Sequence, residues 1–437
     1  GRISERIDEN NNRTDYDHRE IKFIRYDDGA GNFTVINDNG NASQEFLTFV
    51  QNFTGGVVKD NWLGDFYSVG ALYGQEYANN VFSGEFVISN NSSSLFYNNT
   101  FSGNVNNNTF SGGEVYNNTF RGGNVNNNTF SGEVNNNTFS SYVYNNTFSG
   151  DVYGNTFSGY VNINTFSGNV YNNTFSGNVN NNTFGNVNTN TFSGYVYNNT
   201  FGNVNNNTFS GEVSNNTFSG YVYNNTFSGY VYNNTFSGNV NTNTFSAYVR
   251  SNTFGDVSNN TFSGYVYNNT FGEVSNNTFS GYVIVNTFSG EVSNNTFSSY
   301  VNHNTFSGNV NTNTFSSYVN NNTFGKVSNN TFSSYVYNNT FGDVNINTFS
   351  GYVNSNTFSG YVNSNTFSGG VYRNTFSGEV SNNTFSSYVI VNTFSGNVIV
   401  NTFSGIVYNS TLSGDVNTNT FTYAGYLRYV TIADDLQ

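Results

Sequence analysis

The chain has 437 residues, a formal net charge of −14, and no Pro, Cys or Met. Disulfide bonds are therefore excluded, and the negative charge disfavours nucleic acid phosphates and anionic membranes as partners. Only 9% of the residues are charged whereas 18% are aromatic, and because disordered chains are poor in aromatic residues, this composition favours a folded protein.

Residues 1–79 lack a repeat and are interpreted as an N-terminal head that caps the fold or docks to a neighbour. They hold seven of the twelve basic residues and the only Trp, Trp62. Apolar runs at 21–26 and 33–36 flank turn residues and predict a β-hairpin, whereas 43–53 predicts a short helix. The polar first twenty residues are expected to form a flexible or partner-ordered arm. The start at Gly1 suggests a processed or trimmed chain.

Residues 80–421 form a repeat array. From Phe101 to Phe421 the motif N-T-F-S-G-x-V-x-N recurs, with thirty-six Phe residues and one substitute, Leu412, spaced eight to ten positions apart. The step from each Val to the next Phe is always five residues, but the step from Phe to Val is three, four or five. A fixed period of this kind is typical of a solenoid, in which stacked repeats bury a core that no single repeat could bury alone.

The spacing also predicts where each repeat turns. Length variation inside a strand would move side chains to the wrong face, so the variable Ser-Gly segment is expected to be a corner. The five-residue step has odd parity, so it must turn a second corner if Val and Phe both point inward. Each repeat thus supplies two short sides and two corners.

This arrangement resembles the pentapeptide-repeat family over about three quarters of the chain. The resemblance implies a four-sided right-handed coil with Phe inward, the Asn two positions earlier inward, and the Thr between them outward. On the Val sides it places Gly at the small inward position. It implies a fold and no single function. The nine-residue step is also similar to that of calcium-binding β-rolls, but their Gly-Gly-x-Gly-x-Asp turn is absent, so no calcium and no other cofactor is expected.

The residue before each Val alternates between Tyr and a polar residue from Phe227 to Phe349. One coil therefore contains two repeats, or about 17–18 residues, with a Tyr ladder on one side and a polar ladder on the other. We predict an all-β, right-handed, four-sided parallel β-solenoid with a small N-terminal cap, and inward Asn side chains that bond from coil to coil as an amide ladder. Residues 422–437 are expected to form a C-terminal cap, with a final pair of strands within 423–432.

Catalysis has little support in the sequence. The only histidines, His18 and His303, have no nucleophile or carboxylate partner at a recognisable spacing. Acidic residues of the array, such as Asp256 and Glu273, are spread along a ladder rather than paired, which favours a solvated face over acid–base chemistry. The 27–32 segment lacks the closing Glu of a calcium loop and is interpreted as a turn. We therefore expect no enzyme activity and no metal site.

The Tyr ladder is the strongest candidate for an interaction face. It is a flat aromatic stripe suited to glycan binding or to side-by-side packing of rods, while the alternative is that stacked Tyr only stabilises neighbouring strands. An ice-binding Thr ladder and a DNA mimic are both disfavoured, because neighbouring corner residues vary and carboxylates are sparse. The face consists of Tyr230, Tyr248, Tyr265, Tyr282, Tyr300, Tyr318, Tyr335 and Tyr352.

Long Asn-Thr-Phe-Ser-Gly arrays look like those of surface proteins and phage tail fibres associated with gut Bacteroidota. The resemblance implies an extracellular, cell-surface or virion location. The expected function is a structural fibre subunit that associates with itself through its ends. The alternative is an adhesin or tail-fibre shaft that binds cell-surface glycan through the Tyr ladder. No apolar run is long enough to span a bilayer, so no membrane insertion is expected.

Overall fold

The computed structural model divides the chain into two compact units, Gly1–Thr217 (unit 1) and Phe218–Gln437 (unit 2), each of which is described by itself. The structure describes residues 5–7, 13–15, 23–27, 33–37, 57–59, 62–63, 66–68, 72–73, 76–88, 91–92, 94–422, 427–428 and 430–432. No helix that could cross a bilayer occurs within these ranges.

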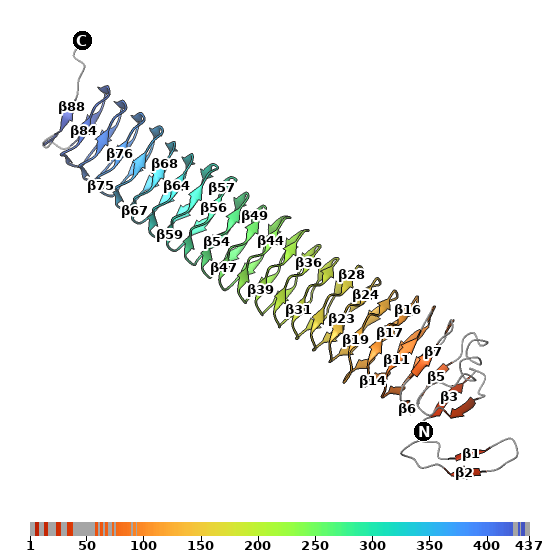
Figure 1. Ribbon diagram of the computed structural model, residues 1–437. Coiled ribbons are helices and arrows are strands. Elements are labelled where there is room, and N and C mark those ends of the chain that lie inside the picture. Colours follow the sequence, from red (N-terminus) through yellow and green to blue (C-terminus); the bar gives the residue numbers. More distant parts are fainter. Residues whose placement is uncertain are drawn as a thin grey trace. The chain divides into compact units, whose positions relative to one another are not determined.

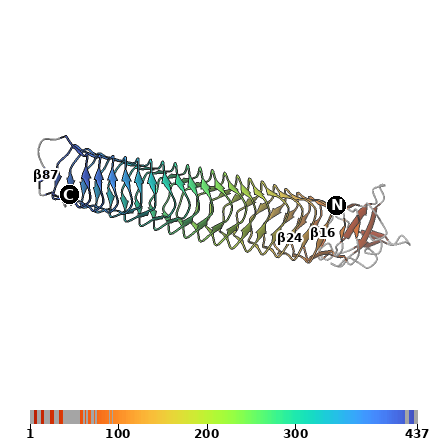
Figure 2. The same ribbon diagram turned by 90° about the horizontal axis from the view of Figure 1, so that it is seen from above.

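Each coil contains four short strands, one on each of four sides. In unit 1 one coil consists of β14 (Thr100–Phe101), β15 (Val105–Asn106), β16 (Thr109–Ser111) and β17 (Val115–Tyr116). In unit 2 one coil consists of β42 (Thr226–Phe227), β43 (Val231–Tyr232), β44 (Thr235–Phe236) and β45 (Val240–Asn241). The sides thus alternate between Thr-Phe strands and Val strands, and coils of this kind stack along each unit (Figures 1 and 2).

Parallel pairing between successive coils confirms the predicted all-β, four-sided solenoid of about 18 residues per turn. Identical positions face each other, as where Phe227 pairs with Phe245 and Val231 with Val249. The step between paired residues is shorter in unit 2, at 17 residues from Phe245 to Phe262, than in early coils of unit 1, at 20 residues from Phe110 to Phe130. The coil therefore accepts changes of length without a change of register.

Both predicted corners lie between strands. The five-residue step from Val to Phe turns at its second residue, where the backbone enters the left-handed region, as at Asn107 (φ 59°) and Asn276 (φ 57°). Asn tolerates this conformation better than most residues. The Phe-to-Val corner contains Ser and Gly, and its two longest copies absorb the extra residue at Gly112 (φ 72°) and Gly122 (φ 84°), since glycine adopts a positive φ without strain.

The core consists of files of identical side chains that run from coil to coil. Phe227 and Phe245 stack with ring centroids 4.8 Å apart, and Phe227 meets Phe236 of the other Phe side edge to face at 6.4 Å. Both geometries are favourable for aromatic rings. The Val side chains close the core and are almost completely buried, as are Val231 and Val240. The predicted inward orientation of Phe and Val is confirmed.

The predicted amide ladder is also present. Each inward Asn donates from its backbone N and its Nδ2 to the Oδ1 of the Asn one coil later, at 2.7 and 3.0 Å for Asn243 and Asn260. The same Nδ2 also donates to the carbonyl oxygens of Val222 and Asn241. At the one lapse in the motif, Ser410 takes over, and its Oγ accepts from the backbone N of Asn392 at 3.1 Å. The inward assignment of Asn is therefore correct, because every group of the amide has a partner.

The N-terminal region contains the predicted hairpin. Strand β3 (Phe23–Asp27) pairs antiparallel with β4 (Phe33–Asn37), whereas the predicted helix at 43–53 lies outside the described residues. Strands β1 (Glu5–Ile7) and β2 (Arg13–Asp15) also pair antiparallel, a feature that the polar composition of this segment did not predict.

Parallel coil pairing extends past the recognisable motif in both directions. Strand β5 (Val57–Lys59) pairs in parallel with β9 (Glu76–Ala78). At the other end, the two expected strands are β87 (Leu427–Arg428) and β88 (Thr431–Ile432), and each pairs in parallel with the preceding coil. The domain boundaries at 79 and 421 stay predictions.

Candidate functional site: the aromatic side

One Val side of each unit carries most of the exposed Tyr, and we call it the aromatic side. The residue before each of its Val residues forms the first column, and the residue after each Val forms the second column. Both columns project outward, because side chains two positions apart lie on the same face of a strand. In unit 1 its strands include β15, β19 (Val125–Asn126), β23 (Val143–Tyr144), β27 (Val161–Asn162), β31 (Val179–Asn180) and β35 (Val196–Tyr197). In unit 2 they include β43, β47 (Val249–Arg250), β51 (Val266–Tyr267), β59 (Val301–Asn302), β63 (Val319–Asn320), β67 (Val336–Tyr337), β71 (Val353–Asn354), β75 (Val371–Tyr372) and β79 (Val389–Ile390).

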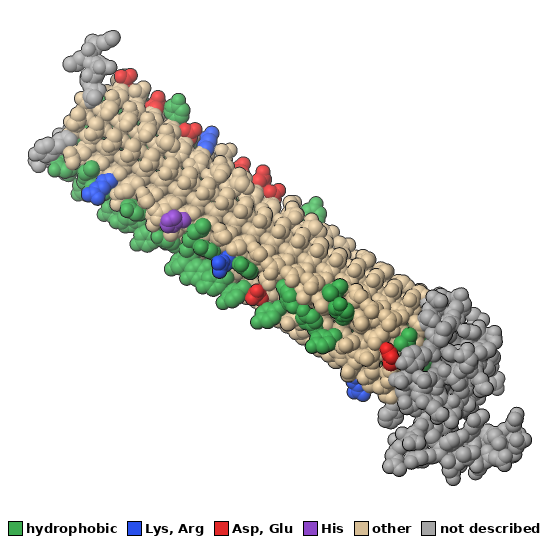
Figure 3. Space-filling model, viewed as in Figure 1, with side chains coloured by type: hydrophobic (Ala, Val, Ile, Leu, Met, Phe, Trp, Pro, Cys, Tyr) green, Lys and Arg blue, Asp and Glu red, His purple; other side chains and the backbone are tan. Residues whose placement is uncertain are grey.

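The structure brings all eight predicted Tyr residues together in the first column of unit 2. Neighbouring rings lie 4.9 to 6.2 Å apart, from the stacked pair Tyr248–Tyr265 to the edge-on pair Tyr300–Tyr318. Tyr230 and Tyr352 are more than half exposed. Figure 3 shows hydrophobic side chains gathered along one edge of this unit, with acidic side chains along another. We call these eight residues the Tyr file.

The Tyr file ends where Gly370 occupies the first column. A Cβ added at Gly370 would lie 3.1 Å from the ring of Tyr352, so that ring leans over the glycine. The next first-column residue is Tyr388, which is 55% exposed. Because Gly370 has no side chain, the first column has a gap there, with the exposed ring of Tyr352 on one side and that of Tyr388 on the other.

The second column adds further rings and one cation. The guanidinium of Arg250 lies between two Tyr residues of neighbouring coils, 5.7 Å from the ring centre of Tyr232 and 5.6 Å from that of Tyr267. This is a cation–π arrangement of the kind that stabilises an exposed Arg by a modest amount.

The predicted ladder of polar residues occupies the other Val side, which we call the polar side. Asp256 and Glu273 precede its Val residues, as the alternation predicted. Among the described residues no group of three or more His, Asp or Glu side chains is placed to hold a metal ion. His303 lies at a left-handed corner (φ 54°), and His18 lies outside the described residues.

Unit 1 carries Tyr residues in its first column that were not singled out from the sequence, namely Tyr142, Tyr160 and Tyr195. Their signal was available, since each directly precedes a Val, but Asn178 interrupts the run and obscures the alternation. The hydroxyl of Tyr160 shares a hydrogen bond with that of Tyr197 in the second column. Burial and this hydrogen bond raise the pKa of Tyr197 to about 12.

Tyr residues on the polar side of unit 1 contact carboxylates instead. The hydroxyl of Tyr153 donates to Glu133 at 3.1 Å, and burial together with this bond raises the pKa of Tyr153 to about 12. Burial and the nearby charge of Asp151 also raise the pKa of Tyr171, whose ring stacks on Tyr153 at 4.9 Å. In both cases the neutral phenol is favoured over the phenolate.

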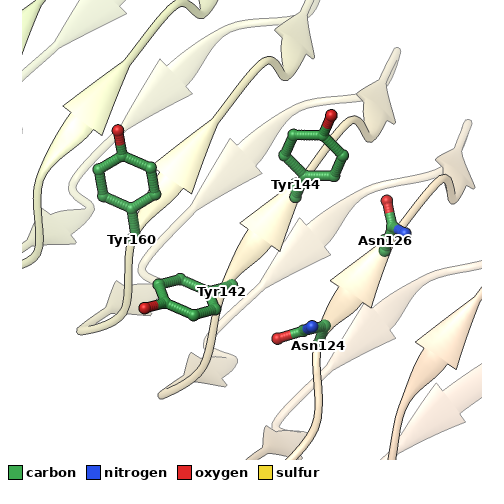
Figure 4. A pocket seen from close by; sticks show the side chains of 5 residues that line it. All are labelled: Asn124, Asn126, Tyr142, Tyr144 and Tyr160. Carbon is green, nitrogen blue, oxygen red and sulfur yellow. The ribbon is translucent and has the colours of Figure 1, made fainter.

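A hollow of about 370 Å³ lies on the aromatic side of unit 1. Its lining consists only of Tyr and Asn, namely Asn124, Asn126, Tyr142, Tyr144 and Tyr160. Figure 4 shows Tyr144 and Tyr160 standing out from the strands, with the Tyr142 ring lying low between them. The Oδ1 of Asn126 is buried and has no hydrogen-bond partner in the described part of the chain.

Two further hollows lie on the aromatic side of the described part of unit 2. The smaller, of about 170 Å³, is again lined only by Tyr and Asn, namely Tyr300, Tyr318, Asn320, Tyr335 and Tyr337. The Nδ2 of Asn320 donates to the hydroxyl of Tyr300 at 3.1 Å, but its Oδ1 is buried without a partner. The larger hollow, of about 310 Å³, lies at the gap left by Gly370.

Comparison with known proteins gives little beyond the fold. No protein-family model matches the chain, and no curated protein matches it. Among solved structures, the PL6-family alginate lyase AlyGC is 9% identical with a TM-score of 0.16, covering 91% of this chain and 98% of the lyase. The tailspike protein of E. coli bacteriophage HK620, solved with a pentasaccharide, is 14% identical with a TM-score of 0.13, covering 89% of this chain and 76% of the tailspike. Likenesses this distant carry no argument about function.

Proposed function

We propose that this protein is a structural subunit of an extracellular or virion fibre, in which each solenoid unit acts as a rigid shaft without catalytic activity. The observation that carries the proposal is the continuity of the interior. Ring stacks such as Phe279–Phe297 (4.8 Å) and Phe288–Phe306 (4.6 Å) repeat along unit 2, and the Asn ladder runs beside them. A core of this kind resists bending and provides length, which is what a shaft requires.

Association through the ends is part of this proposal, and one feature of unit 2 supports it. Phe421 continues the core file of Phe403 but is 41% exposed, whereas Phe403 is 2% exposed. Its strand β86 (Thr420–Phe421) pairs in parallel with β82 (Thr402–Phe403). Among the described strands none pairs with the outer edge of β86, and a stacked ring beside such an edge is what a further coil would cover.

The test is negative-stain imaging of the full chain, with light scattering over a concentration series. We expect filaments whose mass grows with concentration, and slower growth for Phe421→Ser, which removes the exposed ring. Tyr361→Ser is the matched control, since this exposed ring on the polar side lies away from the terminal coil. Short particles of constant mass at every concentration would contradict end-to-end association.

A second candidate function is glycan binding at a cell surface through the Tyr file. It is supported by the exposure of aromatic rings on one side of unit 2, where Tyr318 and Tyr352 are 51% and 55% exposed. Exposed rings in a row are more than the coil needs for its own stability, and grouped apolar surface commonly marks an interaction site.

This second function is tested with the double variant Tyr248→Ala/Tyr265→Ala, which removes the stacked pair formed by the second and third residues of the file. We expect weaker binding to glycan-bearing cells than that of the unaltered chain, with unchanged melting. Equal binding of the two proteins would contradict a role for the Tyr file.

A further inference from the structure

Two of the hollows described above, one in each unit, share the same arrangement on the aromatic side. In the second column an Asn is followed, one coil later, by a Tyr. Asn126 pairs with Tyr144 in unit 1, and Asn320 pairs with Tyr337 in unit 2. In each case the first column of the later coil supplies a second ring. These rings are Tyr142 and Tyr335, respectively.

From this recurrence we infer that the two hollows are subsites for a single neutral pyranose ring of a glycan. The inference deepens the second proposed function, on which it rests, by naming the residues and the class of sugar. Each subsite consists of two Tyr rings on one coil and an Asn amide on the coil before, and we call this set the Asn-Tyr-Tyr subsite.

The rings supply one half of the recognition. Tyr144 and Tyr337 are 40% and 43% exposed, and Tyr142 is 59% exposed. An exposed aromatic face carries partial negative charge, and it attracts the C–H bonds on the face of a pyranose. Hollows of about 370 and 170 Å³ are near or below the lower limit of drug-sized pockets, so each suits one ring rather than a folded oligosaccharide.

The amides supply the other half. The Oδ1 atoms of Asn126 and Asn320 are buried without partners, which leaves an acceptor unsatisfied beside each hollow. Rotation about the soft χ2 bond of Asn turns this acceptor toward a ligand. A sugar hydroxyl is a suitable donor, and a bond to it removes the cost of an unpaired buried oxygen. A purely aromatic ligand would leave that oxygen unpaired.

The lining also indicates the charge of the ligand. Both hollows are lined by Tyr and Asn alone, with no Arg or Lys to pair with a carboxylate or sulfate group. The chain as a whole carries a formal charge of −14. A neutral hexose is therefore favoured over a uronic acid or a sulfated sugar.

A third pair of this kind, in unit 1, has both polar atoms of its Asn amide hydrogen-bonded within the protein. Asn180 also faces Tyr197 one coil later, but its Nδ2 donates to the Tyr160 hydroxyl at 2.9 Å and its Oδ1 accepts from Asn198. Tyr160 in turn bonds to Tyr197. Here the amide is satisfied within the protein, so no acceptor remains for a sugar.

The experiment is isothermal titration of the full chain with cellohexaose, maltohexaose, mannohexaose and chitohexaose, with hexagalacturonate as the anionic comparison. We expect at least one neutral hexaose to bind and hexagalacturonate to bind more weakly. The double variant Tyr144→Ala/Tyr337→Ala should weaken binding by about tenfold or more. The control Tyr223→Ala/Tyr361→Ala removes two exposed rings from the polar side and should stay within about twofold of the unaltered chain.

A further variant, Asn126→Ala, keeps the rings and breaks no bond of Oδ1, so folding is retained while affinity at the unit 1 subsite falls. The inference is overturned if the ring variant binds as the unaltered chain does, or if hexagalacturonate binds best. Loss of binding in Tyr248→Ala/Tyr265→Ala alone would keep the glycan function and remove the subsites. Absence of binding by every neutral hexaose would overturn both.

Discussion

At the scale of the residue, each left-handed corner restricts which amino acids fit its backbone conformation without strain. The conformation recurs at the second position after every Val, and Asn fills most of these sites. At Ile346 (φ 57°) and Val391 (φ 57°), however, a β-branched side chain is held there. Left-handed backbone costs an ordinary residue about 1–2 kcal/mol, and Asn is among the few that adopt it readily. These two corners therefore store strain that the rest of the coil must offset.

Replacing such a residue by Asn should relieve the strain and increase the stability of the protein. Ile346→Asn is expected to raise the free energy of unfolding by about 1 kcal/mol, because the side chain is 55% exposed and loses little packing. Chemical denaturation of the full chain measures the change. The same substitution at Ile399, which lies in strand β81 (Val398–Ile399), should give no gain, and equal effects at both positions would contradict the strain.

The hydroxyl of Tyr153 makes the stability of unit 1 sensitive to alkaline pH. Because its folded pKa is raised from 10.0 to about 12, its contribution is complete below pH 10, where both states are protonated. It is lost as the pH rises toward 12, since the unfolded state ionises first. Between about pH 8 and about pH 11 the melting temperature should fall less for Tyr153→Phe than for the unaltered chain. Tyr144→Phe is the control, and an equal drop in all three proteins would contradict the assignment.

At the scale of the element, two-residue strands are stable here because each belongs to several ladders at once. Beside Thr296–Phe297, for example, Asn295 donates to the Oδ1 of Asn313 and to the carbonyl oxygen of Val274. The amide thus ties together three coils that share no continuous strand. A side chain that would be costly when buried alone becomes part of the sheet when every copy is present.

Removal of one amide from the middle of the ladder tests this dependence. Asn295→Ala leaves the donors of Asn277 without their acceptor, at a cost of about 1–3 kcal/mol for each buried group left unpaired. Asn309→Ala, at an exposed position of the polar side, should have little effect. Thermal unfolding compares the two, and equal melting temperatures would contradict the role of the inward amide.

Much of this fold could be predicted from the sequence, because a strict repeat shows the same spacing of inward residues and corners many times. The invariant five-residue step located the corner at positions such as Asn276, and the alternation of Tyr282 with Glu273 gave the number of repeats per coil. The hollows could not be predicted. They depend on which second-column residues face each other across coils, as Asn126 faces Tyr144, and on the directions of the rings. The period of the repeat specifies neither these cross-coil pairs nor the directions of the rings.

At the scale of the whole molecule, the coil is modular, so its surface pattern depends on whole turns. Deletion of residues 279–296 removes 18 positions, the step from Phe279 to its partner Phe297, and should keep the Tyr file in one column. Deletion of residues 288–296 removes only half a coil and should move every later Tyr to the polar side. We expect the fold to survive both changes, because Phe and Val positions are equivalent on the two halves of the coil.

Cysteine pairs distinguish the two outcomes, since the chain has no Cys of its own. With Tyr265→Cys and Tyr300→Cys, the longer deletion brings the two positions to adjacent coils about 4.8 Å apart, within reach of a disulfide. The shorter deletion places them on different sides. Disulfide formation in the shorter variant, or its absence in the longer one, would contradict the two-repeat coil.

The amide ladder also gives each unit a direction. Backbone bonds alternate, with Val N donating toward the later coil and Thr N toward the earlier one, as for Val292 and Thr296. The bonds from one side-chain amide to the next do not alternate. Asn295 donates to Asn313 and Asn383 to Asn401, so each Oδ1 accepts from the earlier coil, while the same Nδ2 groups also donate to Val carbonyl oxygens of the preceding coil. Their dipoles therefore add along the axis, with acceptors directed toward one end and donors toward the other. When two copies of such a solenoid meet head to tail, amide donors at one end face amide acceptors at the other. Contact between like ends would instead bring like partial charges together. The interior therefore favours a polymer in which every subunit points the same way along the axis.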